Sequence, residues 1–238
     1  MKKIRSTLLI CTAVLAFTSF SAPASAIPMR AVYTGTVSDS YDETNTFGYG
    51  TGRYVLDGLS YTLTFLFDPA APGIVRSTGA TSDLAYGGPI YGFPNPGPMS
   101  SANLTINGHT ETISPEWWGY AEVSNNSFSE YIAYDYVNDG LHVVDSLLVT
   151  YAFDWSPAGT PNGLETPFTS NDLRDTYGQF QFVNADRGPA TKYVWGSLSP
   201  QTLAVSRVSA VPLPAALPLL VAGIAALGLV GRKKIKQQ

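Results

Sequence analysis

The sequence is poor in cysteine and histidine, and this scarcity excludes several kinds of site. Among 238 residues there are one cysteine, Cys11, and two histidines, His109 and His142. Cys11 lies in a segment that we expect to be removed on export, so the mature chain has no disulfide, thiolate metal site or cysteine nucleophile. His109-Thr110-Glu111 matches the His-x-Glu of zinc deaminases, but the cysteine pair that they require is missing. No other catalytic motif is present, so we expect no metal, no cofactor and no enzymatic activity.

Positive charge is also scarce in the middle of the chain. All 18 acidic residues but only seven of the 14 basic residues lie in 27–210. This segment therefore carries a net charge of −11, although the whole chain carries only −4. Because a strongly acidic domain repels phosphate backbones, we do not expect nucleic-acid binding.

The first 26 residues have the pattern of a cleavable signal peptide. Lys2, Lys3 and Arg5 precede an apolar run over 8–20, which is the length of a signal-peptide core. Ala24-Ser25-Ala26 follows, with the small residues at Ala24 and Ala26 that signal peptidase requires. The sequence predicts export and a mature chain that begins at Ile27.

The last part of the chain has the pattern of a membrane anchor. No charged residue lies between Arg207 and Arg232, and the interval exceeds the roughly 20 apolar residues that cross a bilayer. Prolines near its start place the first helical turn near Pro218. We expect a C-terminal transmembrane helix over the rest of the interval. A basic cluster then stops transfer and stays cytoplasmic; its members are Arg232, Lys233, Lys234 and Lys236.

The tail also carries a short proline motif, formed by Val211, Pro212, Leu213, Pro214 and Ala215. This motif, the apolar helix and the basic cluster closely resemble the VPLPA-type branch of the PEP-CTERM sorting signals. The resemblance implies that the tail holds the protein in the inner membrane of a Gram-negative bacterium. It also implies that an exosortase, a membrane peptidase, recognises the motif as a substrate, after which the protein reaches the cell surface or the medium. Such proteins commonly accompany exopolysaccharide, which is therefore an expected partner.

Residues 27–210 form the expected exported domain, and 1–26 and 211–238 are the two sorting segments. The domain has short β-branched and aromatic runs separated by turn residues, which is typical of an all-β fold. Asn107-Gly108 and Asn138-Asp139-Gly140 predict two hairpins. About ten strands are expected, in an antiparallel, jelly-roll-like β-sandwich; they cover 31–37, 59–67, 104–106, 110–113, 131–137, 141–144, 147–153, 177–183, 191–196 and 201–208.

Part of the domain is similar to the opening of other exported β domains that carry this tail. The similar residues are Tyr33 to Val37, Phe47-Gly48, Leu56 to Gly58, Tyr61 to Phe65 and Phe67-Asp68. This similarity implies a shared fold and no known activity.

Exposed tryptophans are the main candidates for ligand contact. Trp117 and Trp118 are adjacent, so in a strand one of them must face outward, where it could stack on a sugar ring. Trp155 and Trp195 are further candidates. Four glutamates near this pair have the composition of a glycan cleft; they are Glu111, Glu116, Glu122 and Glu130.

A second candidate site is the oxygen-rich loop with Asp39, Asp42, Glu43 and Asn45. Its composition suits calcium, but the spacing of an EF-hand fails. A solvated acidic loop is the favoured interpretation, and a weak structural calcium site is the alternative.

From the sequence we expect a non-enzymatic, exported protein of the cell envelope or extracellular matrix, structural or adhesive and associated with exopolysaccharide. The alternatives are a carbohydrate-binding module and, less favoured, a glycoside hydrolase.

Overall fold

The computed structural model describes residues 28–92, 97–140, 142–155, 159–186 and 189–208. The predicted signal peptide, sorting motif, transmembrane helix and basic cluster lie outside these residues. Within them, no helix has the length and apolar character needed to span a membrane. The chain divides into two units between Val208 and Ser209, and every described residue belongs to the first.

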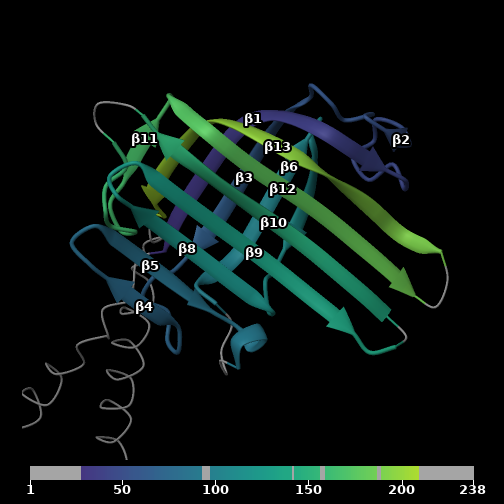
Figure 1. Cartoon of the computed structure of the whole chain (residues 1–238). Helices are drawn as coiled ribbons and strands as arrows, with labels where there is room; N and C mark the ends of the chain where they lie inside the picture. Colours follow the sequence, from purple (N-terminus) through teal and green to yellow (C-terminus); the bar gives the residue numbers. More distant parts are fainter. Residues whose placement is uncertain (1–27, 93–96, 141, 156–158, 187–188, 209–238) are drawn as a thin grey trace, which may run out of the picture. The chain divides into compact units, whose positions relative to one another are not determined.

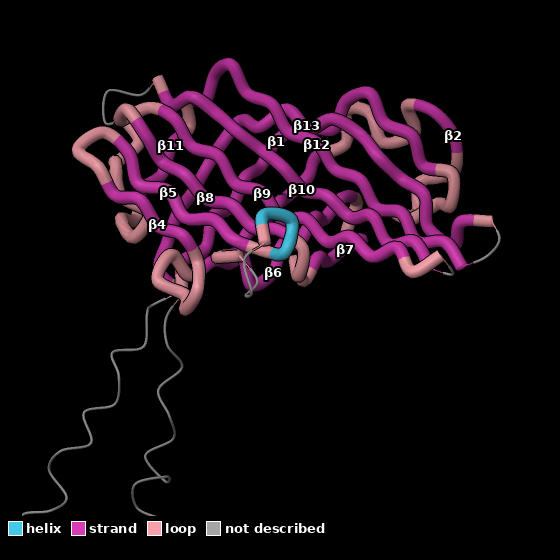
Figure 2. Tube along the Cα trace, turned by 60° about the horizontal axis from the view of Figure 1, so that its bottom comes forward, coloured by secondary structure: helices cyan, strands magenta, loops and turns pink. Residues whose placement is uncertain are grey.

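The described fold consists of strands and one short 3-10 helix, η2 (Pro89–Tyr91), which Figure 2 shows among strands and loops. The strands are β1 (Met29–Asp42), β2 (Gly52–Arg53), β3 (Ser60–Phe67), β4 (Val75–Thr78), β5 (Ser82–Gly87), β6 (Met99–Ile106), β7 (His109–Ile113), β8 (Trp118–Ser124), β9 (Phe128–Asn138), β10 (His142–Asp154), β11 (Phe168–Ser170), β12 (Leu173–Asp186) and β13 (Ala190–Arg207). All of their pairings are antiparallel. The all-β, antiparallel prediction is confirmed.

The strands form one continuous hydrogen-bonded path, in the order β4-β5-β8-β9-β10-β12-β13-β1-β3-β6-β7. The strand β2 pairs with β1, and β11 pairs with β13. The sheet folds over, so that β1, β3 and β6 pass behind β9, β10 and β12 (Figure 1). We call the half with β8, β9, β10 and β12 the front layer, and the half with β1, β3 and β6 the back layer.

The core lies between these two layers. The ring of Tyr131 on β9 stacks on Phe65 of β3 at 5.7 Å between centroids and contacts Phe67 at 5.3 Å. The Tyr33 hydroxyl of β1 hydrogen-bonds the Ser129 hydroxyl of β9 at 2.9 Å, across the interior. All five residues are buried, so contacts between the layers, which are remote in sequence, hold the fold closed.

The two predicted hairpins are present, and two divisions between strands were predicted wrongly. Asn107 and Gly108 both have positive φ, 51° and 78°, as the tight turn between β6 and β7 requires. The second hairpin joins β9 to β10. There the predicted strands 141–144 and 147–153 are one strand, because Asp145 and Ser146 stay paired with both neighbouring strands. The predicted strands 191–196 and 201–208 are likewise one strand, β13, because the backbone between them stays paired with β1 and β12.

Candidate functional site: the outer face of the front layer

The front layer has an inward and an outward side. Successive strand residues point to opposite sides, and buried Ala121 and Tyr131 mark the inward side. The outward positions of β8, β9, β10 and β12 are unusually aromatic. We call this surface the outer face; it consists of Trp118, Tyr120, Glu122, Phe128, Glu130, Ile132, Tyr134, Tyr136, Asp145, Leu147, Val149, Tyr151, Phe153, Tyr177, Gln179 and Gln181.

Strand register aligns these side chains in rows across the layer. Trp118 lies opposite Tyr134, which lies opposite Leu147 on β10. Leu147 lies opposite Gln181, which lies opposite Trp195 on β13. Adjacent strands are about 4.8 Å apart, so this row of five strands is roughly 19 Å long. The outer face is therefore an extended surface, several times longer than a single six-membered ring.

Of the two predicted tryptophans, Trp118 is part of this surface and Trp117 packs against it. The strand β8 begins at Trp118, so the alternation of a strand does not apply to Trp117. The Trp117 ring lies 5.7 Å from that of Tyr136, and the Trp118 ring lies 6.1 Å from that of Tyr120. Both tryptophans are partly exposed. The structure thus places both indoles against tyrosines of the outer face.

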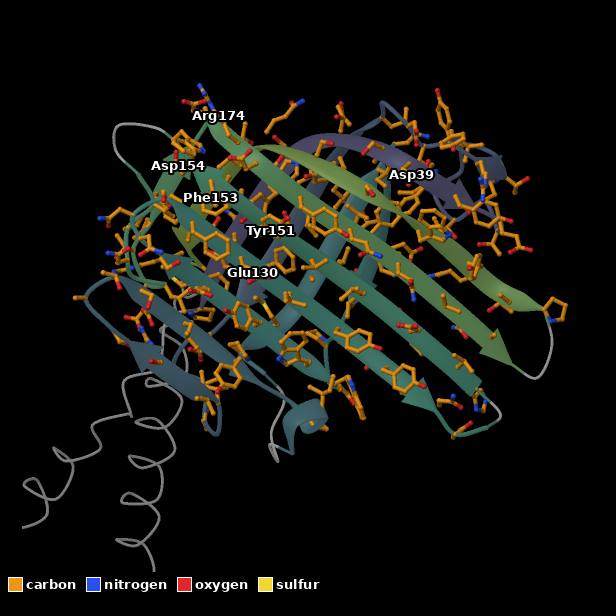
Figure 3. All side chains as sticks on the ribbon, in the orientation of Figure 1. Asp39, Glu130, Tyr151, Phe153, Asp154 and Arg174 are labelled. Carbon is orange, nitrogen blue, oxygen red and sulfur yellow. The ribbon has the colours of Figure 1, made fainter. Side chains whose placement is uncertain are left out.

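A second group of rings lies toward the other end of the same strands. Phe128 contacts Phe153 at 5.2 Å and Tyr151 at 6.5 Å, and Tyr151 stacks on Tyr177 at 5.4 Å. Figure 3 shows Tyr151 and Phe153 on the near side of the ribbon, with no described segment in front of them. These rings were not among the predicted site residues. The sequence feature that could have indicated them is the alternation of aromatic residues in β9 and β10, which we interpreted only as the pattern of a strand.

Carboxylates lie among the rings. Glu122 and Glu130 are directly opposite each other on β8 and β9. The Tyr120 hydroxyl donates a hydrogen bond to Glu122. Partial burial, followed by the charge of Glu122, raises the pKa of Glu130. Burial also raises the pKa of Asp145, whose carboxylate hydrogen-bonds Tyr134 and Gln181.

Positive charge is nearly absent from this surface. The described residues of β8, β9 and β10 include no lysine or arginine. Arg174, the one such residue of β12, lies at the end of the face opposite Phe153 and pairs with Asp172 at 3.1 Å. None of the ion pairs between described residues involves Glu122, Glu130 or Asp145. The outer face is therefore aromatic and negative.

The backbone that carries Trp117 is fixed by a glycine. Gly88 precedes η2 and has a φ of 127°, a conformation that residues with a side chain rarely adopt. A Cβ at Gly88 would lie 2.3 Å from the Trp117 carbonyl oxygen. The close approach at Gly88 therefore helps to set the position of the first indole.

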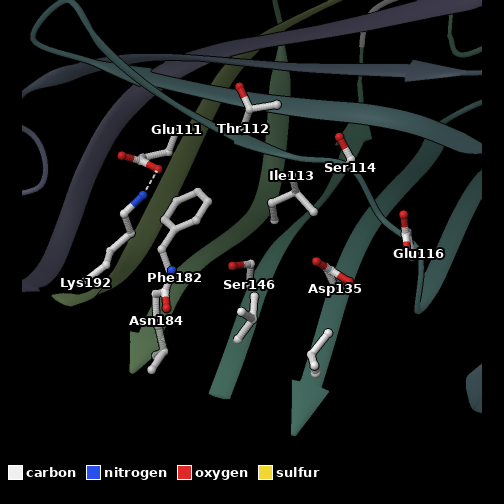
Figure 4. Close-up of a pocket in the computed structure, with 13 residues that line it drawn as sticks. Glu111, Thr112, Ile113, Ser114, Glu116, Asp135, Ser146, Phe182, Asn184 and Lys192 are labelled. Carbon is white, nitrogen blue, oxygen red and sulfur yellow. Dashed lines mark hydrogen bonds and ion pairs between the residues drawn. The ribbon is translucent and has the colours of Figure 1, made fainter. Parts of the chain in front are cut away.

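A separate cleft of about 440 Å³ opens on the inward side of the front layer, beside the edge strand β7. Glu111 on β7 pairs with Lys192 on β13 at 2.5 Å at one end, and Glu116 and Asp135 lie toward the other end (Figure 4). Partial burial, and then Glu116, raise the pKa of Asp135. The other walls of the cleft carry hydroxyl, amide and apolar groups; they are formed by Thr112, Ile113, Ser114, Val137, Val144, Ser146, Phe182, Val183 and Asn184.

The four glutamates whose composition is typical of a glycan cleft lie in two different places. Glu111 and Glu116 line the inward cleft, whereas Glu122 and Glu130 lie on the outer face. The four glutamates share no single site, because Glu116 precedes β8 in a loop while Glu122 and Glu130 occupy outward strand positions. Proximity in sequence could not show this separation.

The oxygen-rich loop is organised by its own backbone. Asp42 is fully buried, and its carboxylate accepts hydrogen bonds from the N–H groups of Thr44, Thr46 and Phe47 at 3.0–3.2 Å. The side chain of Asn45 accepts one from Gly50 at 2.7 Å. In the part of the chain that the structure describes, no group of three or more histidine, cysteine, aspartate or glutamate side chains is arranged to hold a metal ion.

The two histidines occupy unrelated places. The ring of His109 packs against Gly48, where a Cβ would lie 2.5 Å from its Nε2 atom. The Nδ1 atom of His142 lies 3.1 Å from a carboxylate oxygen of Asp139, in the β9–β10 turn, and both side chains are more than half exposed.

Comparison with known proteins adds no relative: no protein-family model, curated protein or solved structure matches this chain. The residues and their geometry are therefore the basis of the functional argument.

Proposed function

We propose that this protein is an exported, non-enzymatic component of the cell envelope or extracellular matrix of a Gram-negative bacterium, and that it adheres to polysaccharide through the outer face. The observation that carries the proposal is the uncovered, partly exposed row that runs from Trp118 and Tyr134 to Trp195. In this proposal the β-sandwich-like domain is the binding unit, and the two terminal segments serve for sorting.

The chemistry of the outer face suits sugars. A pyranose ring presents a flat face of C–H groups, which packs on aromatic rings, and hydroxyl groups at its rim, which need hydrogen-bond partners. Aromatic residues provide large apolar area, and tyrosine and tryptophan add a polar group at the ring edge. Gln179 and Gln181 add amide donors and acceptors between the rings, so stacking and hydrogen bonding are available side by side.

A partly exposed aromatic surface of this length also calls for an explanation. Large apolar patches on soluble proteins commonly mark sites of interaction. The outer face can remain in contact with water before a ligand binds, because the carboxylates of Glu122, Glu130 and Asp145 keep it hydrated. A polysaccharide can then dock along it and leave the acidic surroundings exposed.

The terminal sequences support the proposed location. The signal peptide would direct 27–210 across the inner membrane, and the tail would hold it there by the helix before Arg232. Processing by an exosortase at Val211 to Ala215 would release the domain or transfer it to the surface. The domain would then meet exopolysaccharide outside the cell.

Binding by the outer face is tested with the exported protein as the cells process it. Retardation in gels that contain exopolysaccharide is measured for wild type and for Trp117→Ala and Trp118→Ala. Loss of retardation in these variants supports the proposal. Tyr49→Ala is the matched control, because Tyr49 is 55 % exposed but lies in the loop after β1. Unchanged retardation of both tryptophan variants contradicts binding by this face.

A glycoside hydrolase is the second candidate, favoured by the two carboxylates Glu116 and Asp135 in one cleft. Such enzymes use a pair of acids, one with a raised pKa that acts as the proton donor, and the pKa of Asp135 is raised. Release of reducing ends from polysaccharide, abolished by Asp135→Asn, would support this alternative. The absence of new reducing ends would leave adhesion as the function.

A further inference from the structure

We propose that the outer face selects a polysaccharide with free amino groups, such as a deacetylated hexosamine polymer, over uncharged and acidic polysaccharides. This inference rests on the proposed glycan adhesion and adds the chemical class of the glycan. It is carried by the combination of aligned rings with opposed carboxylates on a surface that is almost free of cations.

The first step is the pair formed by Glu122 and Glu130. Two like charges directly opposite each other on neighbouring strands destabilise a sheet. Here no described lysine or arginine lies between them to offset the repulsion. A ligand ammonium group at this point would compensate both carboxylates at once.

The second step is the set of rings around that pair. Along β8, Tyr120 lies two residues from Glu122 on the same side, and its ring contacts those of Trp118 at 6.1 Å and Tyr86 at 6.5 Å. Across the layer, Glu130 lies opposite Tyr151. Ammonium groups are attracted to the faces of such rings. The carboxylates and the rings therefore favour the same ligand group.

The third step is the spread of negative charge along the layer. Asp145 lies opposite Tyr136 and next to the Trp118 row, whereas Glu130 lies two rows away in the other direction. An extended polymer that follows the strands would meet carboxylates at both places. A polymer with repeated amino groups could use both, whereas a single small cation could not.

The same charges disfavour the other occupants of an apolar face. An acidic polysaccharide or an anionic lipid surface would be repelled, since like charges brought together are unfavourable. A second copy of this chain, packed face to face, would place further carboxylates against Glu122 and Glu130. An amine-bearing glycan is the occupant whose charge complements this surface.

The test measures affinity by titration calorimetry for three soluble oligosaccharide series of matched length: β-linked glucosamine, β-linked glucose and a uronic acid. Wild type is expected to bind the glucosamine series most tightly and the uronic acid series least. In Glu122→Gln/Glu130→Gln, affinity for glucosamine oligomers should fall by about fivefold or more, while affinity for glucose oligomers stays or rises. Added salt should weaken only the glucosamine interaction of wild type.

Glu43→Gln is the matched control, because it also removes one negative charge, but Glu43 is exposed in the loop after β1 and lies outside the outer face. It should leave the glucosamine preference unchanged. Equal affinity of wild type for glucose and glucosamine, lost in Trp118→Ala, would overturn the charge selection and leave glycan adhesion intact. Absence of binding to every oligosaccharide series would overturn both the charge selection and the glycan adhesion. Both would also be overturned if sedimentation showed a dimer of the wild type that dissociates in the double variant or in Trp118→Ala.

Discussion

Glu122 on β8 and Glu130 on β9 lie directly opposite each other on the outer face, and neither forms an ion pair with a described residue. Natural sheets more often place opposite charges at such positions. The pair therefore reduces the stability of the free protein, and it does so on the surface where we propose that a ligand binds. Because these charges lie on the proposed binding surface, they link the stability of the protein, its dependence on pH and the proposed choice of ligand.

Glu130→Gln should stabilise the free protein at neutral pH by about 0.5 kcal/mol, because it removes one of two opposed charges. The pKa of Glu130 is raised in the folded state, so the folded state holds this proton more tightly than the unfolded state. Stability should therefore fall as pH rises from the unfolded pKa through the folded pKa. Urea unfolding of both proteins at acid and neutral pH checks this.

At acid pH, where Glu130 is protonated in both states, wild type and Glu130→Gln should have the same stability. Glu43→Gln, in an exposed loop position, is the control and should behave as wild type at both pH values. A Glu130→Gln variant that is less stable than wild type at neutral pH would contradict the repulsion.

The hydrogen bond between Tyr33 and Ser129 should contribute to closure of the two layers. Tyr33→Phe leaves the buried Ser129 hydroxyl without this partner, which should cost about 1–2 kcal/mol of unfolding free energy. Tyr61→Phe is the matched comparison, since the buried Tyr61 hydroxyl has no hydrogen-bond partner among the described residues. Its removal should be neutral or stabilising. Urea unfolding measures both variants. An equal loss of unfolding free energy in Tyr33→Phe and Tyr61→Phe would argue against a specific contribution of the Tyr33 hydrogen bond.

The carboxylate of Asp83 should hold the segment after β10 onto β5. Asp83 is 2 % exposed; it accepts bonds from Arg76 at 2.8 and 3.1 Å and from the Leu164 N–H at 3.0 Å. Asp83→Asn should lower stability by about 2–3 kcal/mol, because Arg76 loses its buried partner, and should expose 159–167 to proteases. Glu165→Gln removes only an exposed partner of Arg76 and should cost less than about 1 kcal/mol. Equal protease sensitivity of the two variants would contradict the prediction.

Gly88→Ala should disturb the position of the Trp117 indole, which packs against the outer face. A Cβ there meets the Trp117 carbonyl oxygen, and the positive φ is strained for alanine, so stability should fall by about 1–3 kcal/mol. At temperatures where the variant is folded, retardation by polysaccharide should still be weaker than for wild type. Gly79→Ala, where the nearest atom would be 3.6 Å away, is the control. If Gly88→Ala is retarded as strongly as wild type, the close approach at Gly88 does not position Trp117 for binding.

Processing of both termini is expected on export, and mass spectrometry of the protein from cells with an exosortase measures it. The mature chain should begin at Ile27 and lack the basic cluster at Arg232 to Lys236. Replacement of Pro212 and Pro214 by alanine should leave the tail attached. Surface-located protein with an intact C-terminus in wild-type cells would contradict the sorting proposal.

The sequence predicted the class of secondary structure better than the arrangement of the strands. The all-β class follows from local pattern, and so does the turn at Asn107 and Gly108, where the residues themselves favour positive φ. The strands β2, β4, β5, β8 and β11 were missed. The strands β5 and β8 contain small residues such as Ala85 and Gly119, which have weak strand preference. They are strands because both have paired neighbours, and pairing depends on segments far away in sequence.

The sequence by itself determined that 27–210 is acidic, free of cysteine and rich in strand patterns, and it predicts sorting segments at both ends, because composition and local motifs are properties of consecutive residues. Only the tertiary structure decided that Glu122 and Glu130 share a surface with Trp118 and Tyr151, while Glu116 faces a separate cleft. The physical reason is register. A strand residue shows one of two faces, and the pairing of whole strands, fixed by burial of the core between the layers, decides which residues meet on each face.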